Sequence, residues 1–325
     1  MDIQPEDKSL LVVDVSHLAF LYDNITQELT ARYGGQVVDT RIASNILKSL
    51  WRWSKHGIDD VVVCFDSSIP SRREFIQKTF GCKYKPNRHH RYTIRLGLDL
   101  TYELLKIGNV STLKCDDYEA DDLIGATVSY LHDKYKHINV VTGDFDLVPL
   151  VDDKVSVFLR SHKIDSGNPS FRKYYELTPE SYSKIPEVWS KCKGWYIPYN
   201  TMLLYKMTFG DESDGIPGIT YETASGSQRR VYPKSKFGDL VEKMIADDVD
   251  ISNIFRFGDS VPEDMLTVVK DEMGEEFVQP VLDRYQAMNL NQGYSTRGVF
   301  RCHGMPTNLS KDFVKAAAEI DTHIV

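Results

Sequence analysis

The sequence predicts an α/β protein with a mostly parallel central sheet flanked by helices and a helical C-terminal part packed on that core. Three observations lead to this fold class. Short apolar runs rich in β-branched residues alternate with helix-length segments, as in sheets of buried parallel strands. Aspartate follows the strongest of these runs. Beyond residue 161 the composition shifts and the patterns become mainly helical. We therefore expect an α/β core over residues 1–161 and a mainly helical part over residues 162–325.

The strongest strand patterns occupy residues 10–13, 61–65 and 138–142, and aspartates stand where these runs end. They are Asp14, Asp66, Asp144 and Asp146. Ligands of open α/β sheets bind at the carboxyl ends of the strands, so these side chains are expected to converge on one acidic rim. Carboxylates that lie close together raise one another's pKa and are tolerated mainly when cations neutralise them. The repeated placement therefore predicts a cation site.

A helix is predicted to begin inside the acidic stretch of residues 116–125, because apolar residues follow it at helical spacing. Carboxylates in a first turn suit the positive end of the helix dipole, and Asp116 or Asp117 is expected to cap the helix. Glu119 and Asp122 would share one face. Alone, the stretch is typical of an acidic helix start. Beside the strand ends, it would add carboxylates to the rim.

Further apolar patterns predict the remaining elements. Helices are expected over residues 39–56, 92–107, 199–209, 236–246, 263–273, 275–288 and 310–318, and further strands over 110–114 and 154–160. Residues 210–219 have the composition of a loop or tight turn, with Asp211 and Asp214 between glycines and a proline. No element is predicted within residues 162–198.

Composition limits the class of protein. The chain has 325 residues, a formal net charge of −8 and five cysteines without paired metal-type spacing. Reduced thiols and no zinc site are therefore expected. No run of eighteen apolar residues and no signal-peptide pattern is present, so we expect a cytoplasmic protein without a membrane partner.

A basic segment on this acidic chain spans residues 70–95, where eight basic residues face one acidic residue. Basic residues interleaved with tyrosine can contact phosphates and stack on unpaired bases. A solvated loop is the alternative reading of such charge. The position directly after Asp66 favours function, because loops at the carboxyl end of a strand overhang the site.

Five blocks of the sequence resemble the 5′ nuclease family, the flap endonucleases and 5′→3′ exonucleases of bacteriophages and of bacterial DNA polymerase I. The blocks are residues 11–19, 65–88, 118–125, 142–146 and 210–218, in the family's order. The resemblance implies a PIN/5′-nuclease-like fold. It also implies a stand-alone, bacteriophage-type enzyme in the host cytoplasm, because no polymerase domain is expected to follow.

The resemblance further implies two Mg²⁺ or Mn²⁺ ions held by nine carboxylates. One group would be Asp14, Asp66, Glu119 and Asp121; the other would be Asp144, Asp146, Asp211 and Asp214, with Asp122 near both. The mainly helical part would complete the site through Asp211 and Asp214. Lys85 and one of Arg72 or Arg73 would be catalytic, contacting the scissile phosphate.

Nucleic acid would be contacted by eight further residues. They are Lys83, Tyr84, Arg88 and Arg91 in the basic segment, which would thread the 5′ end, and Arg229, Arg230, Lys234 and Lys236 beyond it, which would grip the duplex. The family usually continues after the fifth block with a glycine hairpin and a lysine. Those glycines are absent after Ile219, which argues against a potassium (K⁺) site there.

The function that the resemblance implies is hydrolysis at 5′ ends or flaps of DNA or RNA:DNA hybrids, in primer removal of the RNase H type during replication or in repair. A single-stranded-DNA-binding protein or a polymerase is the partner suggested by analogy. Two alternatives stay open, a PIN-like ribonuclease on single-stranded RNA and a non-catalytic protein that binds DNA structures. An aspartyl-phosphate phosphatase is excluded, because Ser16 stands where its second aspartate is required.

Overall fold

The computed structural model describes residues 7–23, 29–33, 36–55, 57–67, 70–86, 92–116, 118–160, 174–178, 202–247, 249, 261 and 263–289. At its centre lies a six-stranded sheet of order β5-β4-β1-β6-β7-β8. Its strands are β1 (Ser9–Asp14), β4 (Asp60–Cys64), β5 (Ser111–Leu113), β6 (His137–Thr142), β7 (Val155–Leu159) and β8 (Tyr175–Leu177). Neighbours pair in parallel except β7 and β8, which pair antiparallel. The predicted mostly parallel sheet is confirmed.

β1 is the central strand of the core. The side chains of Leu10, Leu11, Val12 and Val13 are all fully buried, because both faces of the sheet are covered by helices. Leu11 and Val13 join the apolar cluster on one face, while Leu10 and Val12 join the cluster on the other. Burying each such side chain contributes about 1.5–3 kcal/mol. This two-sided burial explains why the strand is a continuous apolar run rather than an alternating one.

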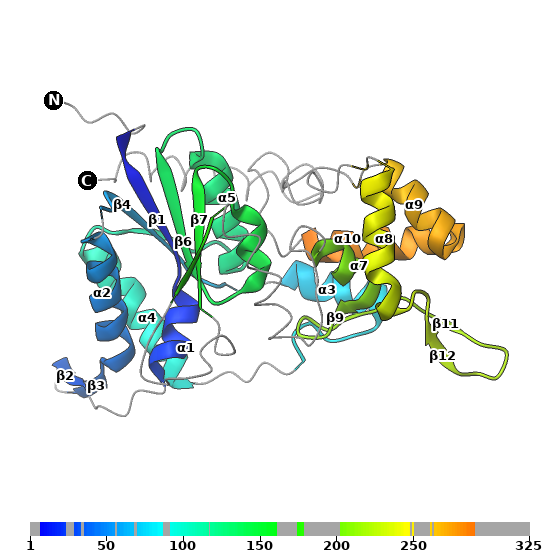
Figure 1. The fold of residues 1–325 in the computed structure, drawn as a ribbon. Helices are drawn as coiled ribbons and strands as arrows, with labels where there is room; N and C mark the ends of the chain where they lie inside the picture. Colours follow the sequence, from blue (N-terminus) through cyan, green and yellow to red (C-terminus); the bar gives the residue numbers. More distant parts are fainter. Residues whose placement is uncertain are drawn as a thin grey trace.

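Helices cover both faces of the sheet, as Figure 1 shows. One face carries α1 (Val15–Asp23), α2 (Arg41–Ser54) and α4 (Tyr92–Ile107), whose apolar side chains pack with those of the first face of β1. The other face carries α5 (Ala120–Leu131). A 3₁₀ helix, η2 (Phe145–Leu150), follows β6. A small hairpin of β2 (Thr30–Tyr33) and β3 (Gln36–Asp39) precedes α2 and was not predicted.

The C-terminal helices form a second layer beside the α5 face (Figure 1). They are α7 (Met202–Phe209), α8 (Phe237–Ala246), α9 (Glu263–Met273) and α10 (Val278–Asn289), with short 3₁₀ turns η5 (Lys234–Lys236) and η7 (Glu275–Phe277). Their apolar side chains continue the cluster that begins on the sheet. Between α7 and α8 lie β9 (Gly210–Asp211), β10 (Ile216–Pro217) and a hairpin of β11 (Thr220–Glu222) and β12 (Gln228–Arg230). That hairpin projects away from the body (Figure 1).

Part of the basic segment is a helix rather than the overhanging loop that we expected. α3 (Pro70–Phe80) packs against β10 and α10, in the second layer of the molecule. The helix forms because Pro70 suits a first helical position and Ile76 is fully buried. The predicted helix over residues 310–318 lies outside the described residues, as does the expected boundary at residue 161.

Candidate active site

Three neighbouring strands bring their aspartates to the same edge of the sheet. Asp14 is the last residue of β1, and Asp66 and Asp144 each lie two residues beyond the end of β4 or β6. Because β4, β1 and β6 are adjacent and parallel, their carboxyl ends meet there. Asp144 and Asp66 both act electrostatically on Asp14. The structure therefore brings together the strand-end carboxylates that the sequence predicted.

Two hydroxyl groups hold the strand-end carboxylates in place, and the sequence analysis assigned neither of them a role. The Ser16 hydroxyl donates to Asp66 Oδ2 over 2.7 Å, and the backbone N–H of Ala120 donates to Asp66 Oδ1 over 3.0 Å. The buried Thr142 hydroxyl donates to Asp14 Oδ2 over 3.2 Å and accepts from the backbone N–H of Asp144 over 3.0 Å. Each hydroxyl thus links two of the segments that form the rim.

The start of α5 supplies the next carboxylates. The N-cap is Glu119, so the expected cap at Asp116 or Asp117 is wrong. Asp122 accepts a 2.8 Å hydrogen bond from the Glu119 backbone N–H, which fixes the first turn. Asp121 lies among the strand-end aspartates: burial, then Asp144 and Asp14, raise its pKa well above the ordinary value. One helical turn thus aims its carboxylates in two directions.

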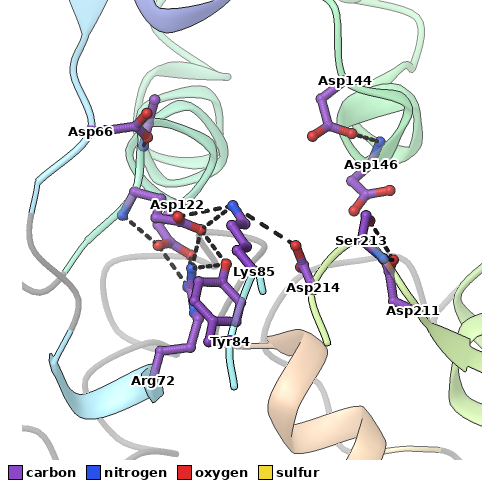
Figure 2. A network of polar contacts seen from close by, with 12 residues as sticks. Asp66, Arg72, Tyr84, Lys85, Asp122, Asp144, Asp146, Asp211, Ser213 and Asp214 are labelled. Carbon is purple, nitrogen blue, oxygen red and sulfur yellow. Dashed lines mark hydrogen bonds and ion pairs between the residues drawn. The ribbon is translucent and has the colours of Figure 1, made fainter. Parts of the chain in front are cut away.

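Arg72 binds two of these carboxylates from below the rim (Figure 2). Its Nη1 lies 2.5 Å from Glu119 Oε2, and its Nη2 lies 2.7 Å from both oxygens of Asp122. The arginine is 3% exposed, so these contacts are shielded from water. Arg72 therefore sits behind the carboxylates instead of facing a phosphate. Asp122 lies against Arg72, not between the two carboxylate groups as we expected.

Lys85 stands between the two groups of carboxylates (Figure 2). Its Nζ lies 2.9 Å from Glu119 Oε1 and 3.8 Å from Asp214 Oδ1, and its side chain is 23% exposed. Burial lowers the pKa of Lys85, but Asp214 and Glu119 outweigh burial and raise it above its ordinary value. The Tyr84 hydroxyl donates to Glu119 Oε2 over 2.6 Å. Lys85 is thus a protonated, partly exposed amine at the edge of the rim.

The backbone around Lys85 is locked to the 210–218 segment. Lys85 has a φ of 46°, in the left-handed region, and its N–H donates to the Asp214 carbonyl over 3.2 Å. Gly215 has a φ of +75°, and a Cβ there would lie 2.2 Å from the Lys83 carbonyl oxygen. Only glycine permits this approach. The turn that carries Asp214 therefore determines the position of the Lys85 amine.

The second group contains Asp144, Asp146, Asp211 and Asp214, which Figure 2 shows on the opposite side of Lys85 from Asp66. The backbone N–H of Asp146 donates to Asp144 Oδ1 over 2.9 Å, so η2 begins with one aspartate capping the next. Lys206 on α7 binds Asp146 and lies 2.6 Å from Asp211 Oδ2. The sequence analysis missed Lys206. Its signal is a single charge in an otherwise uncharged helix that ends directly before Asp211.

Burial and neighbouring charges raise the pKa of some of these carboxyl groups and lower the pKa of others. Burial first, then Asp66 and Asp144, raise the pKa of Asp14 to about 7, and burial raises that of Asp214 to about 6. Burial, together with the nearby charges of Asp144 and Asp211, also raises the pKa of Asp146, although Lys206 acts to lower it. For Glu119, Arg72 and Lys85 outweigh burial and lower the pKa to about 2. Such divergent values are typical of functional sites.

The remaining predicted residues are dispersed. Arg73 and Lys83 are exposed beside the site, and Arg229, Arg230, Lys234 and Lys236 are exposed on the β11–β12 hairpin and on η5. The Lys234 amine lies 5.2 Å from the centre of the Tyr205 ring. Arg88 and Arg91 lie outside the described residues.

Carboxylate oxygens are the ligands of hard divalent cations. Within the described residues, however, no three acidic, histidine or cysteine side chains already converge as a ready-made cation cage. The ammonium groups of Lys206 and Lys85 and the guanidinium of Arg72 now contact several of the carboxylates. The donor chemistry fits partly hydrated ions such as Mg²⁺, which bind through a few carboxylates and retain water.

A cavity of about 610 Å³ lies elsewhere, at the end of the sheet where β1 and β6 begin, lined by aromatic residues such as Trp53 and Phe158. None of the rim carboxylates lines it. Among the described helices, none is both long and apolar enough to cross a membrane.

Comparison with known proteins places the chain among nucleases. The family model described as 5′-3′ exonuclease, N-terminal resolvase-like domain, matches residues 9–176. DNA polymerase I of Thermus aquaticus is 27% identical over 215 residues, which cover 65% of this chain and 22% of that protein. A 5′-3′ exonuclease of Buchnera aphidicola is 27% identical over 217 residues, 65% of this chain and 66% of the relative. The chain thus spans about a fifth of the length of the polymerase relative.

Solved structures share the fold over nearly the whole chain. A bacteriophage T5 flap endonuclease complex with DNA and metal ions superposes with a TM-score of 0.62 and 15% identity, covering 97% of this chain and 100% of the other. T5 5′-exonuclease with bound zinc gives a TM-score of 0.60 and 17% identity, covering 96% and 99%. At these identities the likeness concerns the fold, which agrees with the fold class predicted from the sequence.

Proposed function

Because this chain belongs to the 5′-3′ exonuclease family, we propose that it is a metal-dependent 5′→3′ exonuclease and flap endonuclease. The observation that carries the proposal is the acidic rim itself. Carboxylates from β1, β4, β6 and α5 meet those of the 210–218 segment, and Lys85 stands between the two groups. The crowding of like charge destabilises such a rim unless positive charges neutralise it, either from side chains such as Lys85 or from bound cations.

The cofactor in this proposal is a pair of Mg²⁺ or Mn²⁺ ions, bound by seven of the nine carboxylates predicted from the sequence. The other two, Glu119 and Asp122, are held by Arg72. Asp14, Asp66 and Asp121 would hold one ion, and Asp146, Asp211 and Asp214 the other, with Asp144 beside both groups. Such ions, when bound, neutralise a scissile phosphate and lower the pKa of a bound water. The structural relatives that carry metal ions support a divalent cofactor in general.

The chain's own residues would orient the phosphate and the ligands. Lys85 presents a partly exposed ammonium at the edge of the rim, where it can donate to a phosphate oxygen and stabilise the charge that develops there. Arg72 and Tyr84 would hold Glu119 in one orientation from behind. The hydroxyls of Ser16 and Thr142 would do the same for Asp66 and Asp14. The groups that hold Glu119, Asp66 and Asp14 therefore position the rim without touching the substrate, whereas Lys85 contacts it.

The substrate in this proposal is a 5′ end or flap of DNA or of an RNA:DNA hybrid, as in primer removal. The basic segment after α3 leads directly to Lys85, so a strand held by exposed Lys83 and Arg73 would reach the rim. The arginines of the β11–β12 hairpin stand clear of the body and would contact duplex phosphates. A single-stranded-DNA-binding protein or a polymerase would be the partner by analogy alone, and the cell or host cytoplasm the site of action.

The test is cleavage of a 5′-flap duplex labelled separately at each end, with Mg²⁺ and with EDTA. We expect metal-dependent release of short products from the 5′ end, and the product lengths separate nucleotide-by-nucleotide removal from removal of whole flaps. Asp121→Asn is the matched inactive control, because it keeps the side-chain shape and removes one rim charge. Cleavage of single-stranded RNA with an inert duplex would replace the proposal with a PIN-like ribonuclease. Tight binding without cleavage would replace it with a DNA-structure-binding protein.

A further inference from the structure

Lys206 bridges two carboxylates of the second group, Asp146 and Asp211. It is the single charged side chain of α7, and its ammonium contacts both carboxylate oxygens of Asp146 and lies 2.6 Å from Asp211 Oδ2. Asp146 belongs to η2 at the end of the sheet, whereas Asp211 belongs to β9 after α7. One positive charge therefore bridges carboxylates that come from the core and from the C-terminal part.

Both carboxylates use all of their oxygens in this arrangement. Asp211 Oδ1 accepts from the backbone N–H and the hydroxyl of Ser213, and Oδ2 faces the ammonium. Asp146 directs both oxygens at Lys206. An ammonium group has three N–H donors and no lone pair, so Lys206 cannot itself coordinate a metal ion, and its positive charge repels a cation that approaches the same oxygens. A cation that binds here has to compete with Lys206.

The environment keeps Lys206 charged. Its ammonium is in direct contact with Asp146 and Asp211, and the negative charges of Asp144 and Asp214 also act on it. The lysine side chain is 14% exposed and its flexible four-carbon stem allows the amine to move. The same four carboxylates form the second half of the rim. Lys206 thus neutralises part of the negative charge that a bound cation would otherwise neutralise.

We propose that Lys206 is the internal counter-ion of the Asp146–Asp211 site and that a divalent cation must displace its ammonium to bind there. The inference rests on the proposed function, which assigns these carboxylates to a cation. Lys206 would set the cation concentration at which this half of the rim fills. In the cation-free protein it would also offset the repulsion between the two carboxylates and so keep them close together.

The test compares Mn²⁺ binding to the whole protein by isothermal titration calorimetry in the wild type and in Lys206→Met. Methionine keeps an unbranched side chain that α7 accommodates and removes the ammonium. If the ammonium is away from the two carboxylates in about a tenth of the molecules, its removal should lower the Kd of one Mn²⁺ binding step about tenfold. In EDTA the variant should melt at a lower temperature, because Asp146 and Asp211 lose their counter-ion, and Mn²⁺ should restore the loss.

The matched control is Lys243→Met, which removes a lysine of an exposed ion pair with Glu272, 2.6 Å long, on α8. It should change neither the Mn²⁺ affinity nor its stoichiometry. Lys206→Arg provides a folded variant that keeps the charge, and it should not gain affinity. Unchanged or weaker Mn²⁺ binding by Lys206→Met would overturn the inference and leave the nuclease proposal intact. Absence of Mn²⁺ binding in wild type and variant alike would overturn the proposed function and the inference together.

Discussion

Arg72 and Arg73 are adjacent on α3, but the helix points their side chains in different directions. Arg72 is buried against Glu119 and Asp122, whereas Arg73 is exposed. From the sequence, either could contact the phosphate. The geometry divides the roles: Arg72 holds the carboxylates, and Arg73 is the one available to a bound strand. Adjacent residues on a helix diverge by about 100°, so neighbouring positions do not share a function.

We expect Arg72→Met to lower the free energy of unfolding by about 3–5 kcal/mol, because it leaves two buried carboxylates without their partner. Arg73→Met is the matched control and should change stability by less than about 0.5 kcal/mol. Urea denaturation, followed by circular dichroism, measures both. Equal stability of the two variants, with only turnover affected in Arg72→Met, would show instead that Arg72 acts on the substrate.

Lys85 differs from Arg72 because its amine reaches the surface of the rim. We expect Lys85→Ala to lower turnover more than about 100-fold while DNA affinity changes by less than about threefold, since the interaction forms mainly as charge develops on the phosphate. Single-turnover kinetics and binding in EDTA separate the two quantities. Lys83→Ala, an exposed neighbour, should instead weaken binding with little loss of turnover. Parallel losses of affinity and turnover in Lys85→Ala would reduce Lys85 to a binding residue.

A residue of the rim could be predicted from the sequence where its position at the end of a strand pattern was enough to place it. A strand-end aspartate such as Asp14 or Asp66 points to the site because the ends of parallel strands meet. Lys206 and Thr142 were not predictable in the same way. Their roles depend on which carboxylate they reach after folding, and Lys206 is 60 residues away from Asp146 in the chain. Tertiary partners of this kind leave no periodic pattern.

Between elements, one close approach that affects the site is that of the 210–218 segment to the backbone of Lys83–Lys85. Gly215 permits this approach for two reasons. Its φ of +75° suits glycine, and a Cβ would lie 2.2 Å from the Lys83 carbonyl oxygen and 3.2 Å from Pro86 Cδ. Any side chain must push the two segments apart. The hydrogen bond from Lys85 N–H to the Asp214 carbonyl would then lengthen and the amine would leave the rim.

We therefore expect Gly215→Ala to lower turnover at least about tenfold and to destabilise the fold by more than the roughly 1–2 kcal/mol that a left-handed alanine costs. Gly226→Ala is the matched control. Its φ is +78°, but a Cβ there would meet nothing closer than 3.8 Å, so only the conformational cost applies and turnover should persist. If both variants lose stability and turnover alike, the close contact with Lys83 has no separate effect.

At this scale the sequence predicted elements with strong periodicity and missed those that depend on packing. The helices at Tyr92–Ile107 and Glu263–Met273 begin and end where their patterns predicted. α3 was missed because its charge resembles that of a loop, and its burial of Ile76 depends on contact with distant elements. The β2–β3 and β11–β12 hairpins are short and largely exposed, so their sequences carry little apolar alternation to reveal them.

Across the whole molecule, the rim makes stability depend on pH and on cations together. Folding raises the pKa values of Asp14 and Asp146 to about 7 and those of Asp122 and Asp214 to about 6. Between about pH 4 and pH 7 the folded protein therefore holds more protons than the unfolded chain, and its stability falls as the pH rises. Glu119 and Asp211, with pKa values lowered to about 2, act the other way only below about pH 4.5.

In EDTA, we thus expect the melting temperature to fall by several degrees between pH 5 and pH 8, a window in which Glu119 and Asp211 stay ionised. Burial lowers the pKa of His137, which opposes this trend, but it is one group against the five carboxyls whose pKa values folding raises. Mg²⁺ should reverse most of the fall at pH 8, because a cation neutralises the ionised rim. Asp14→Asn should flatten the slope in EDTA, since it removes one of the two carboxyls whose pKa is raised to about 7. If the melting temperature instead rises from pH 5 to pH 8 in EDTA, repulsion among the rim carboxylates does not destabilise the fold. Catalysis alone would then require the cation.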